Sequence, residues 1–160
     1  MIIRPYAPID ADAVWSVLEP HIRAGETFAL PRDWTREQAI ASWCGAPHET
    51  YVAEADGEVV GTYYIQPNQL GGGSHVANGG YATASGASGK GVARAMCAHS
   101  LDRARAQGYR AMQFNFVVAT NERAVALWKS FGFAILATLP AVFAHPIHGF
   151  VDAHVMFRTL

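Results

Sequence analysis

A glycine-rich segment that begins a helix is the strongest chemical feature of the sequence. It runs from Ser85 to Arg94 and follows a run of strand-forming residues. The first N–H groups of a helix have no intrahelical acceptor and lie at the positive end of the helix dipole. Glycines let a phosphate approach such a turn closely, and Lys90 and Arg94 add positive charge. The segment therefore predicts an anion site for the phosphates of a nucleotide or a coenzyme.

Two common phosphate motifs fit this segment poorly. A nucleotide P-loop requires glycine, four residues and then Gly-Lys followed by Ser or Thr. Position 84 is alanine and Gly91 follows the lysine, so the magnesium-binding hydroxyl is missing. A dinucleotide fingerprint requires Gly-x-Gly-x-x-Gly, but Arg94 stands at the third glycine position. A coenzyme A pyrophosphate loop and an ordinary glycine-rich turn with a solvated lysine remain.

A second motif, downstream of the next expected strand, favours the coenzyme A interpretation. Residues 121–133 read Asn-Glu-Arg-Ala-Val-Ala-Leu-Trp-Lys-Ser-Phe-Gly-Phe. They resemble the pattern of the GNAT acetyltransferase superfamily, which is Asn, two residues, Ala, two residues, Leu, an aromatic residue and then Gly-Phe. The distance from the glycine-rich segment is also similar to that in the superfamily. The resemblance covers nearly the whole chain, because the order of expected elements matches as well.

Hydrophobic periodicity and turn signals predict the elements that would position these motifs. Strands are expected at residues 2–6, 49–55, 59–66, 75–83, 111–118, 133–139 and 154–160. Helices are expected to begin at Asp10, Thr35, Gly89 and Asn121, and Asp56-Gly57 predicts a hairpin turn. The order β-α-α-β-β-β-α-β-α-β-β predicts a single α/β (α+β) domain over residues 1–160. The resemblance implies a mixed, mostly antiparallel sheet, splayed between its fourth and fifth strands and flanked by helices.

The resemblance also implies an acetyl-CoA site in that opening. The pantetheine arm would pair with the backbone of the fourth strand, and the pyrophosphate would lie on the glycine-rich turn. The Asn121 side chain would reach the pantetheine or the reacting centre. The residues implied to bind acetyl-CoA are Tyr81, Ala82, Thr83, Ser88, Gly89, Lys90, Gly91, Val92, Ala93, Arg94, Asn121, Ala124 and Trp128. No metal is expected, because no Cys or paired carboxylate completes a ligand set with the loop residues His145 and His148.

The sequence departs from the superfamily pattern at two positions. Ser88 replaces the usual Gln or Arg, which matters little where backbone amides hold the phosphates. Trp128 stands where a tyrosine often protonates the leaving thiolate, and an indole has no suitable proton. Either water would then protonate the thiolate, or the thiolate would leave without an acid. Attack by the amine is expected to be direct, so neither Cys44 nor Cys97 is required.

Positions in the expected fold indicate candidate general bases and candidate contacts to the acceptor amine. Glu26 and His75 are candidate general bases. Alternatively, Glu26 is a solvated loop carboxylate and His75 is a strand-edge residue without a role. Asn78 and Asn115 lie inside the two expected strands that form the opening, where Asn is disfavoured. They could hold a neutral or carboxylate-bearing molecule, or satisfy buried backbone. The aromatic residues expected to line the acceptor pocket are Phe28, Tyr63, Tyr64 and Phe143, although aromatics at such positions often belong to the core.

The sequence around residues 112–124 and 145–153 resembles a GNAT branch that includes fungal enzymes acetylating proline analogues such as azetidine-2-carboxylate. By that resemblance Asn78 and Asn115 would hold the substrate. The alternatives are a protein or peptide N-acetyltransferase, which would need an open and often acidic groove, and a non-catalytic acyl-CoA sensor. A homodimer is a further possibility that the resemblance implies.

Composition limits the partners. The chain has 160 residues and a formal net charge of -1, so bulk charge favours neither a nucleic acid nor a membrane surface. We expect no secretory leader at the start of the chain, and no apolar run approaches the ~18 residues that a membrane span needs. We therefore expect a cytoplasmic protein. The bulky loops expected at residues 26–33 and 140–152 favour a covered pocket for a small-molecule amine over an open peptide groove.

Overall fold

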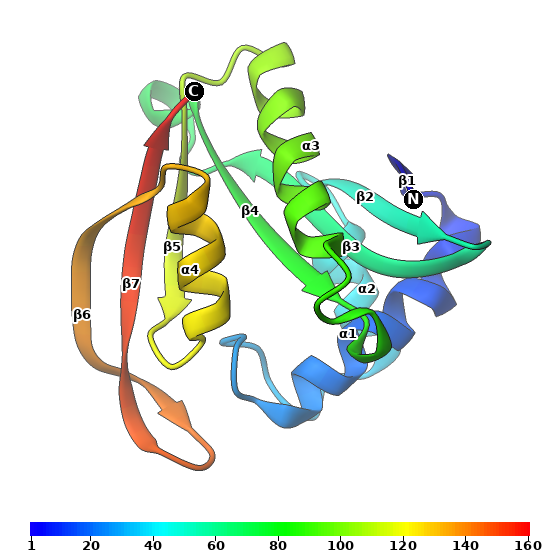
Figure 1. Ribbon diagram of the computed structural model, residues 1–160, viewed down its shortest axis with the longest axis horizontal. Coiled ribbons are helices and arrows are strands. Elements are labelled where there is room, and N and C mark those ends of the chain that lie inside the picture. The colour runs from blue at the N-terminus through cyan, green and yellow to red at the C-terminus, as the bar shows by residue number, and fades with distance from the viewer.

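A single mixed sheet of seven strands, in the order β1-β2-β3-β4-β5-β7-β6, organises the molecule. The computed structural model describes residues 1–160. Helices α1 and α2 cover one face of the sheet, and α3 and α4 cover the other (Figure 1). The strands are β1 (Ile2–Pro5), β2 (Glu49–Ala55), β3 (Glu58–Pro67), β4 (Val76–Thr83), β5 (Ala111–Val118), β6 (Ala134–His145) and β7 (Gly149–Thr159). The helices are α1 (Ala11–Ala24), α2 (Arg36–Cys44), α3 (Val92–Ala106) and α4 (Glu122–Ser130).

Local sequence signals fix most of these boundaries. Helix α1 ends at Gly25, whose φ of 66° is the left-handed conformation that glycine adopts without strain. Helix α2 begins at a capping box in which Thr35 accepts a hydrogen bond from the Gln38 N–H while the Gln38 side chain accepts one from the Thr35 N–H. The predicted fold class and element order are confirmed.

The sheet opens between β4 and β5. These strands are parallel and pair only at Val76 with Ala111 and Ala77 with Met112. One residue later, the Asn78 side-chain nitrogen donates to the Gln113 carbonyl at 2.9 Å, and beyond it the two strands diverge. β4 keeps its other edge paired with β3 over its whole length. The expected splay is therefore present, and one edge of β4 is left without a strand partner.

The C-terminal hairpin differs from the sequence-based expectation. Short strands around a long loop were expected, but β6 and β7 are 12 and 11 residues long and pair up to His145 and Gly149. Pro140 does not end β6, because an irregularity in pairing between Leu139 and Phe143 absorbs it. At that irregularity the Ala141 N–H donates to the Asp152 carboxylate at 2.9 Å.

Two apolar clusters fill the two faces of the sheet. One lies under α1 and α2 and includes Val14, Leu18 and Trp43. The larger one lies under α3 and α4, and its side chains reach from β2 across to β7. None of the helices is long and apolar enough to cross a membrane.

Candidate active site

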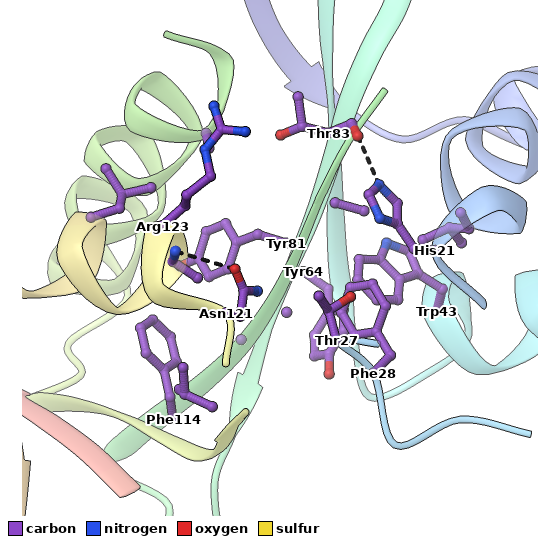
Figure 2. A pocket seen from close by; sticks show the side chains of 18 of the residues that line it. His21, Thr27, Phe28, Trp43, Tyr64, Tyr81, Thr83, Phe114, Asn121 and Arg123 are labelled. Carbon is purple, nitrogen blue, oxygen red and sulfur yellow. Dashed lines mark hydrogen bonds between the residues drawn. The ribbon is translucent and has the colours of Figure 1, made fainter. Parts of the chain in front are cut away.

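A cavity of about 1110 Å³ occupies the opening between β4 and β5. Its walls come from the loop after α1, from β3 and β4, from the turn before α3, and from β5 and α4. In Figure 2, Asn121 and Arg123 at the start of α4 lie on one side of β4, and His21, Phe28 and Trp43 lie on the other. The cavity thus has two halves, which the edge of β4 separates.

Hydrogen bonds at the start of β4 fix which of its residues face the opening. The Val76 carbonyl accepts from the Asn68 N–H at 2.7 Å, on the side of β3. The His75 carbonyl accepts from the Arg110 N–H at 2.9 Å, on the side of β5. In an antiparallel pair, the N–H and C=O of one residue point to the same neighbour, and successive residues alternate. Even-numbered residues of β4 therefore face β3, and odd-numbered ones face the opening.

Gly79, Tyr81 and Thr83 consequently direct their backbone groups into the cavity. The Thr83 carbonyl accepts a hydrogen bond from Nε2 of His21 at 2.8 Å, and the other groups have no partner within the chain. An extended amide-bearing chain could pair with this edge as an added strand would. The expectation for Ala82 is corrected: its backbone faces β3, where it is paired with Thr62, and it only lines the cavity.

The turn before α3 presents unpaired amides to the same cavity. The first hydrogen bond of the helix runs from the Ala95 N–H to the Gly91 carbonyl at 3.0 Å. Gly89 and Gly91 have φ of 78° and 81°, which only glycine adopts readily. The N–H groups of the turn without an acceptor in the chain are those of Gly89, Gly91, Val92, Ala93 and Arg94. Free amides at a helix N-terminus suit an anion, and the phosphate site itself stays a prediction.

The two other predicted residues of this turn behave differently. The Ser88 and Lys90 amides donate to the carbonyls of Ser85 and Ala87, at 3.4 and 3.3 Å. Ser88 still lines the cavity, whereas Lys90 is exposed and lies outside its lining. The structure therefore does not bring Lys90 into the predicted phosphate cradle.

Helix α4 forms the wall opposite the turn. Asn121 caps the helix, and its side-chain oxygen accepts from the Ala124 N–H at 3.3 Å, so its amide nitrogen has no partner in the chain. Asn121, Ala124 and Trp128 all line the cavity. Arg123 lines it too and was not singled out from the sequence. Arg94 lies beside α4, with its guanidinium 3.2 Å from the Ser130 hydroxyl.

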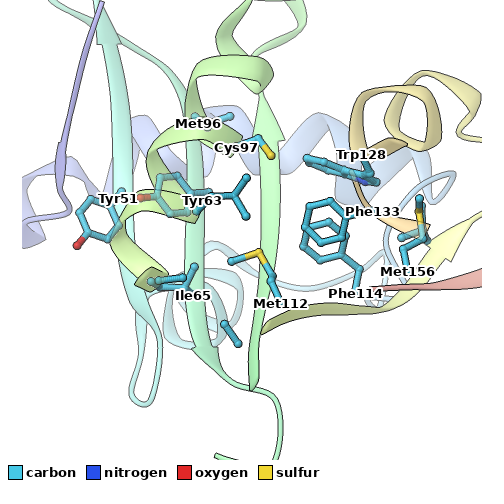
Figure 3. Close-up of a cluster of buried hydrophobic side chains, with 14 of the residues drawn as sticks. Tyr51, Tyr63, Ile65, Met96, Cys97, Met112, Phe114, Trp128, Phe133 and Met156 are labelled. Carbon is cyan, nitrogen blue, oxygen red and sulfur yellow. The ribbon is translucent and has the colours of Figure 1, made fainter. Parts of the chain in front are cut away.

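Trp128 is a packed wall residue. Its ring centroid lies 4.8 Å from that of Tyr81 and 4.9 Å from that of Phe114, and its side chain is largely buried (Figure 3). The Tyr81 hydroxyl is turned away from the cavity and is 2.7 Å from the Ser100 hydroxyl of α3. Neither side chain is positioned to donate a proton in the opening.

Aromatic rings close the other half of the cavity. Phe28 packs edge-on against Trp43 at 5.6 Å, and Trp43 packs edge-on against Tyr64 at 4.9 Å. His48 stacks on Tyr64 at 3.8 Å. His21 completes the wall from α1. Phe28 lines the cavity as expected, and the two histidines were missed because nothing in their local sequence distinguishes them.

The expectation for Tyr63 is wrong. Its side chain is fully buried in the cluster under α3, where its hydroxyl is 2.6 Å from Nδ1 of His99 (Figure 3). Successive side chains of a strand point to opposite faces, so only one of Tyr63 and Tyr64 can face the cavity. That residue is Tyr64. Phe143 is buried against Phe116 and does not line the cavity.

The candidate bases Glu26 and His75 do not reach the cavity. His75 is exposed and lies in the turn before β4, at the end where β4 and β5 pair and not where they diverge. Glu26 lies in the loop after α1, but the lining begins at the next residue, Thr27. The imidazoles that do line the cavity are those of His21 and His48.

Asn78 and Asn115 both reach the opening, as their strands predicted. Each is already bound to protein groups. Asn78 donates to the Gln113 carbonyl, and the Asn115 amide nitrogen donates to the Asn68 side-chain oxygen at 2.6 Å. Asn115 also accepts from the Gln113 side chain at 2.9 Å. Asn78 thus satisfies a backbone carbonyl, as the alternative interpretation expects, whereas the acceptor interpretation of both residues stays a prediction.

No set of three or more His, Cys, Asp or Glu side chains could hold a metal ion. His145 and His148 are adjacent, but the N–H groups of Ile147 and His148 donate to Nδ1 of His145. This imidazole therefore closes the hairpin.

Comparison with known proteins agrees with the fold. Residues 15–133 match the Acetyltransferase (GNAT) family, and the chain belongs to this family. A solved GCN5-related N-acetyltransferase from Kribbella flavida is 41% identical, with a TM-score of 0.94 over 99% of this chain and 97% of its own. The acetyltransferase yncA of Salmonella typhimurium, solved with its cofactor acetyl-CoA, is 20% identical and shares the fold with a TM-score of 0.88 over 100% and 94% of the two chains.

A curated relative matches over only part of its length and of this chain. The N-acetyltransferase aca1 of Schizosaccharomyces pombe is 32% identical over 100 residues, which are 61% of this chain. The match spans 47% of the fission yeast protein, so this chain corresponds to about half of that relative.

Proposed function

We propose that the protein is an acetyl-CoA-dependent N-acetyltransferase that acetylates the amine of a small molecule by direct attack. The observation that carries the proposal is the unpaired edge of β4, in line with the free amides before α3. The amides of Gly79 and Tyr81 suit a thioester and a pantetheine arm, and those of Gly89 to Arg94 suit a pyrophosphate. Acetyl-CoA would bring the activated acetyl group to the boundary between the two halves.

The aromatic half of the cavity supports a small acceptor. Phe28, Trp43 and Tyr64 form contiguous walls, and Leu30 and Trp34 from the loop after α1 also line the cavity. A peptide would need an open groove past this loop. The lining contains no carboxylate, so polyamines, which carry several positive charges, are poor candidates.

Carboxamides in the opening suit an amine that carries a carboxylate. Arg94 and Arg123 are the only Arg or Lys side chains of the lining, and they belong to the half with the free amides, where they suit the phosphates of coenzyme A. The free nitrogen of Asn121 and the carboxamide of Asn115 are further hydrogen-bonding groups in the opening. We therefore propose a cyclic amino acid, such as azetidine-2-carboxylate or another proline analogue, as the acceptor class.

A thiol-release assay with acetyl-CoA and a panel of amines tests the proposal. The panel contains proline analogues, common amino acids, polyamines and a histone-like peptide. We expect release with a cyclic amino acid and a large loss in Asn115→Ala, while Gln69→Ala, which removes an exposed carboxamide after β3, remains active. Turnover of the peptide alone would overturn the acceptor class. Tight acetyl-CoA binding without any turnover would indicate a sensor, and no binding would overturn the whole proposal.

We also propose that two copies associate through the β6–β7 hairpin. β6 is one of the two edge strands of the sheet, and exposed apolar side chains along the hairpin include Leu136, Val142 and Phe150. Long apolar edge strands usually pair or are covered. Sedimentation equilibrium should give the mass of two chains, and Val142→Lys should reduce it to one. A single-chain mass for the unaltered protein would contradict this proposal.

A further inference from the structure

One phenol hydroxyl in the cavity has no protein partner. Tyr63 and Tyr81 direct their hydroxyls to His99 and Ser100, on the α3 face of the sheet. Tyr64 points to the opposite face, lines the cavity and makes no hydrogen bond within the chain (Figure 2). Its hydroxyl is therefore free to contact a bound molecule.

The Tyr64 ring lies directly against the edge of β4. A Cβ built on Gly80 would be 2.6 Å from Cε1, 2.9 Å from Cζ and 3.0 Å from Oη of Tyr64. Only glycine leaves room for the ring at this point. The flanking residues Gly79 and Tyr81 turn their backbone groups to the opening, so the hydroxyl lies next to the segment proposed to hold the thioester.

Neighbouring side chains hold the ring in place. His48 stacks on it with an interplanar angle of 6°, and Trp43 packs edge-on against it at 87°. His48 is itself held by a hydrogen bond between its Nδ1 and the Trp43 carbonyl at 3.0 Å. Since a carbonyl only accepts, Nδ1 carries the proton in the neutral ring. A ring held from two sides positions its hydroxyl without further loss of side-chain freedom.

The reaction requires a proton at sulfur. The amine nitrogen attacks the thioester carbon, the C–N bond forms, and the C–S bond breaks to release a thiolate and a protonated amide. The thiolate must gain a proton, and the nitrogen must lose one. Trp128, packed against Tyr81 and Phe114, cannot supply the proton.

We infer that the Tyr64 hydroxyl donates this proton to the coenzyme A thiolate as the C–S bond breaks. The inference rests on the proposed acetyltransferase function. The tyrosinate then regains a proton from the amine nitrogen, directly or through water, so that protons balance over one turnover. Tyr64 would thereby act as the general acid, a role that Trp128 of α4 cannot fill.

The environment of the phenol keeps the hydroxyl protonated before the reaction. Burial raises the pKa of Tyr64 above its ordinary value, so the hydroxyl is protonated at neutral pH and available as a donor. No charged side chain is bonded to it.

Tyr64→Phe is the first test, with acetyl-CoA and azetidine-2-carboxylate, or whichever panel amine turns over fastest. We expect kcat to fall about 10²-fold or more, with little change in acetyl-CoA affinity measured by calorimetry. Tyr63→Phe is the matched control, because it removes the neighbouring hydroxyl and its bond to His99 from the core. It should lower the melting temperature but keep kcat within about threefold. If Tyr64→Phe also keeps kcat, the inference is wrong, whereas an inactive unaltered protein overturns the proposed function instead.

Replacing Tyr64 with 3,5-difluorotyrosine distinguishes proton donation from packing. Fluorine lowers the phenol pKa with little change in ring size. A proton donor at this position predicts that the basic limb of the kcat–pH profile moves to lower pH. An unmoved profile in an active fluorinated enzyme would show that the hydroxyl only fills space.

Discussion

Gly80→Ala should displace the Tyr64 ring and impair catalysis without a large effect on folding. The added Cβ would meet Cε1 of Tyr64 at 2.6 Å, whereas carbon atoms in contact prefer about 3.5–4.0 Å. The ring must therefore move by about 1 Å, and a misplacement of that size can cost about 10²-fold in rate. Gly80 has no left-handed φ, so alanine meets no backbone strain there. Overpacking of about 1–3 kcal/mol is partly offset by the entropy of glycine, about 0.5–1 kcal/mol.

The assay is steady-state kinetics beside urea denaturation. Gly72→Ala is the control, because a Cβ at Gly72 meets no atom within 4 Å and its φ is also ordinary. We expect wild-type kcat for the control and a loss of about 10²-fold for Gly80→Ala. Because both changes act on one hydroxyl, Tyr64→Phe combined with Gly80→Ala should lose little more than Tyr64→Phe alone. Full activity of Gly80→Ala, or additive losses in the double variant, would refute the geometric argument.

Three further predictions address the phosphate turn, the N-terminal ion pair and the thiols. Gly91→Ala, at φ 81°, should cost about 1–2 kcal/mol in stability and weaken acetyl-CoA binding measured by calorimetry; unchanged affinity would contradict the phosphate site. The Arg4 guanidinium, 2.8 Å from Asp10, holds the pKa of that carboxyl below its ordinary value. Its stabilisation is therefore present above the unfolded-state pKa of about 3.9 and is lost as pH falls through the folded value. Asp10→Asn should cost about 1.5–3 kcal/mol in urea denaturation at neutral pH and much less at acid pH, and an equal cost at both would contradict the assignment. Burial raises the pKa of Cys44 to about 11 and that of Cys97 to about 12, so iodoacetamide near neutral pH should leave activity intact, and rapid inactivation would argue against direct attack.

The features that the sequence predicted are those that local chemistry determines. The glycines at 89 and 91 require left-handed backbone before a helix, and this fixes the turn and its free amides. The Thr35–Gln38 capping box likewise depends only on residues three apart. In both cases the signal and the structure that it specifies lie within one turn of chain.

Other features depend on contacts between distant segments, and there prediction failed. Tyr63 and Tyr64 are chemically alike, and only the register of β3 and the covering helices decide which one enters the cavity. The prediction for His75 failed because the point at which β4 and β5 diverge depends on both strands, and His75 lies at the end where they pair. His48 reaches Tyr64 through the chain reversal before β2, which no periodic pattern reports.

Two local features, one on each strand, lie at the level of the opening. On β5, pairing with β7 is interrupted between Phe114 and Val117, so Asn115 is free to turn its side chain to Asn68. On β4, the pair Gly79-Gly80 lets the Tyr64 ring cross the strand. The exposed edge of β4 and the Tyr64 phenol therefore meet at the same two residues. If this coupling is functional, filling the edge with acetyl-CoA should stabilise β4 and the Tyr64 ring together, and amide exchange at Gly79 and Tyr81 should slow on binding.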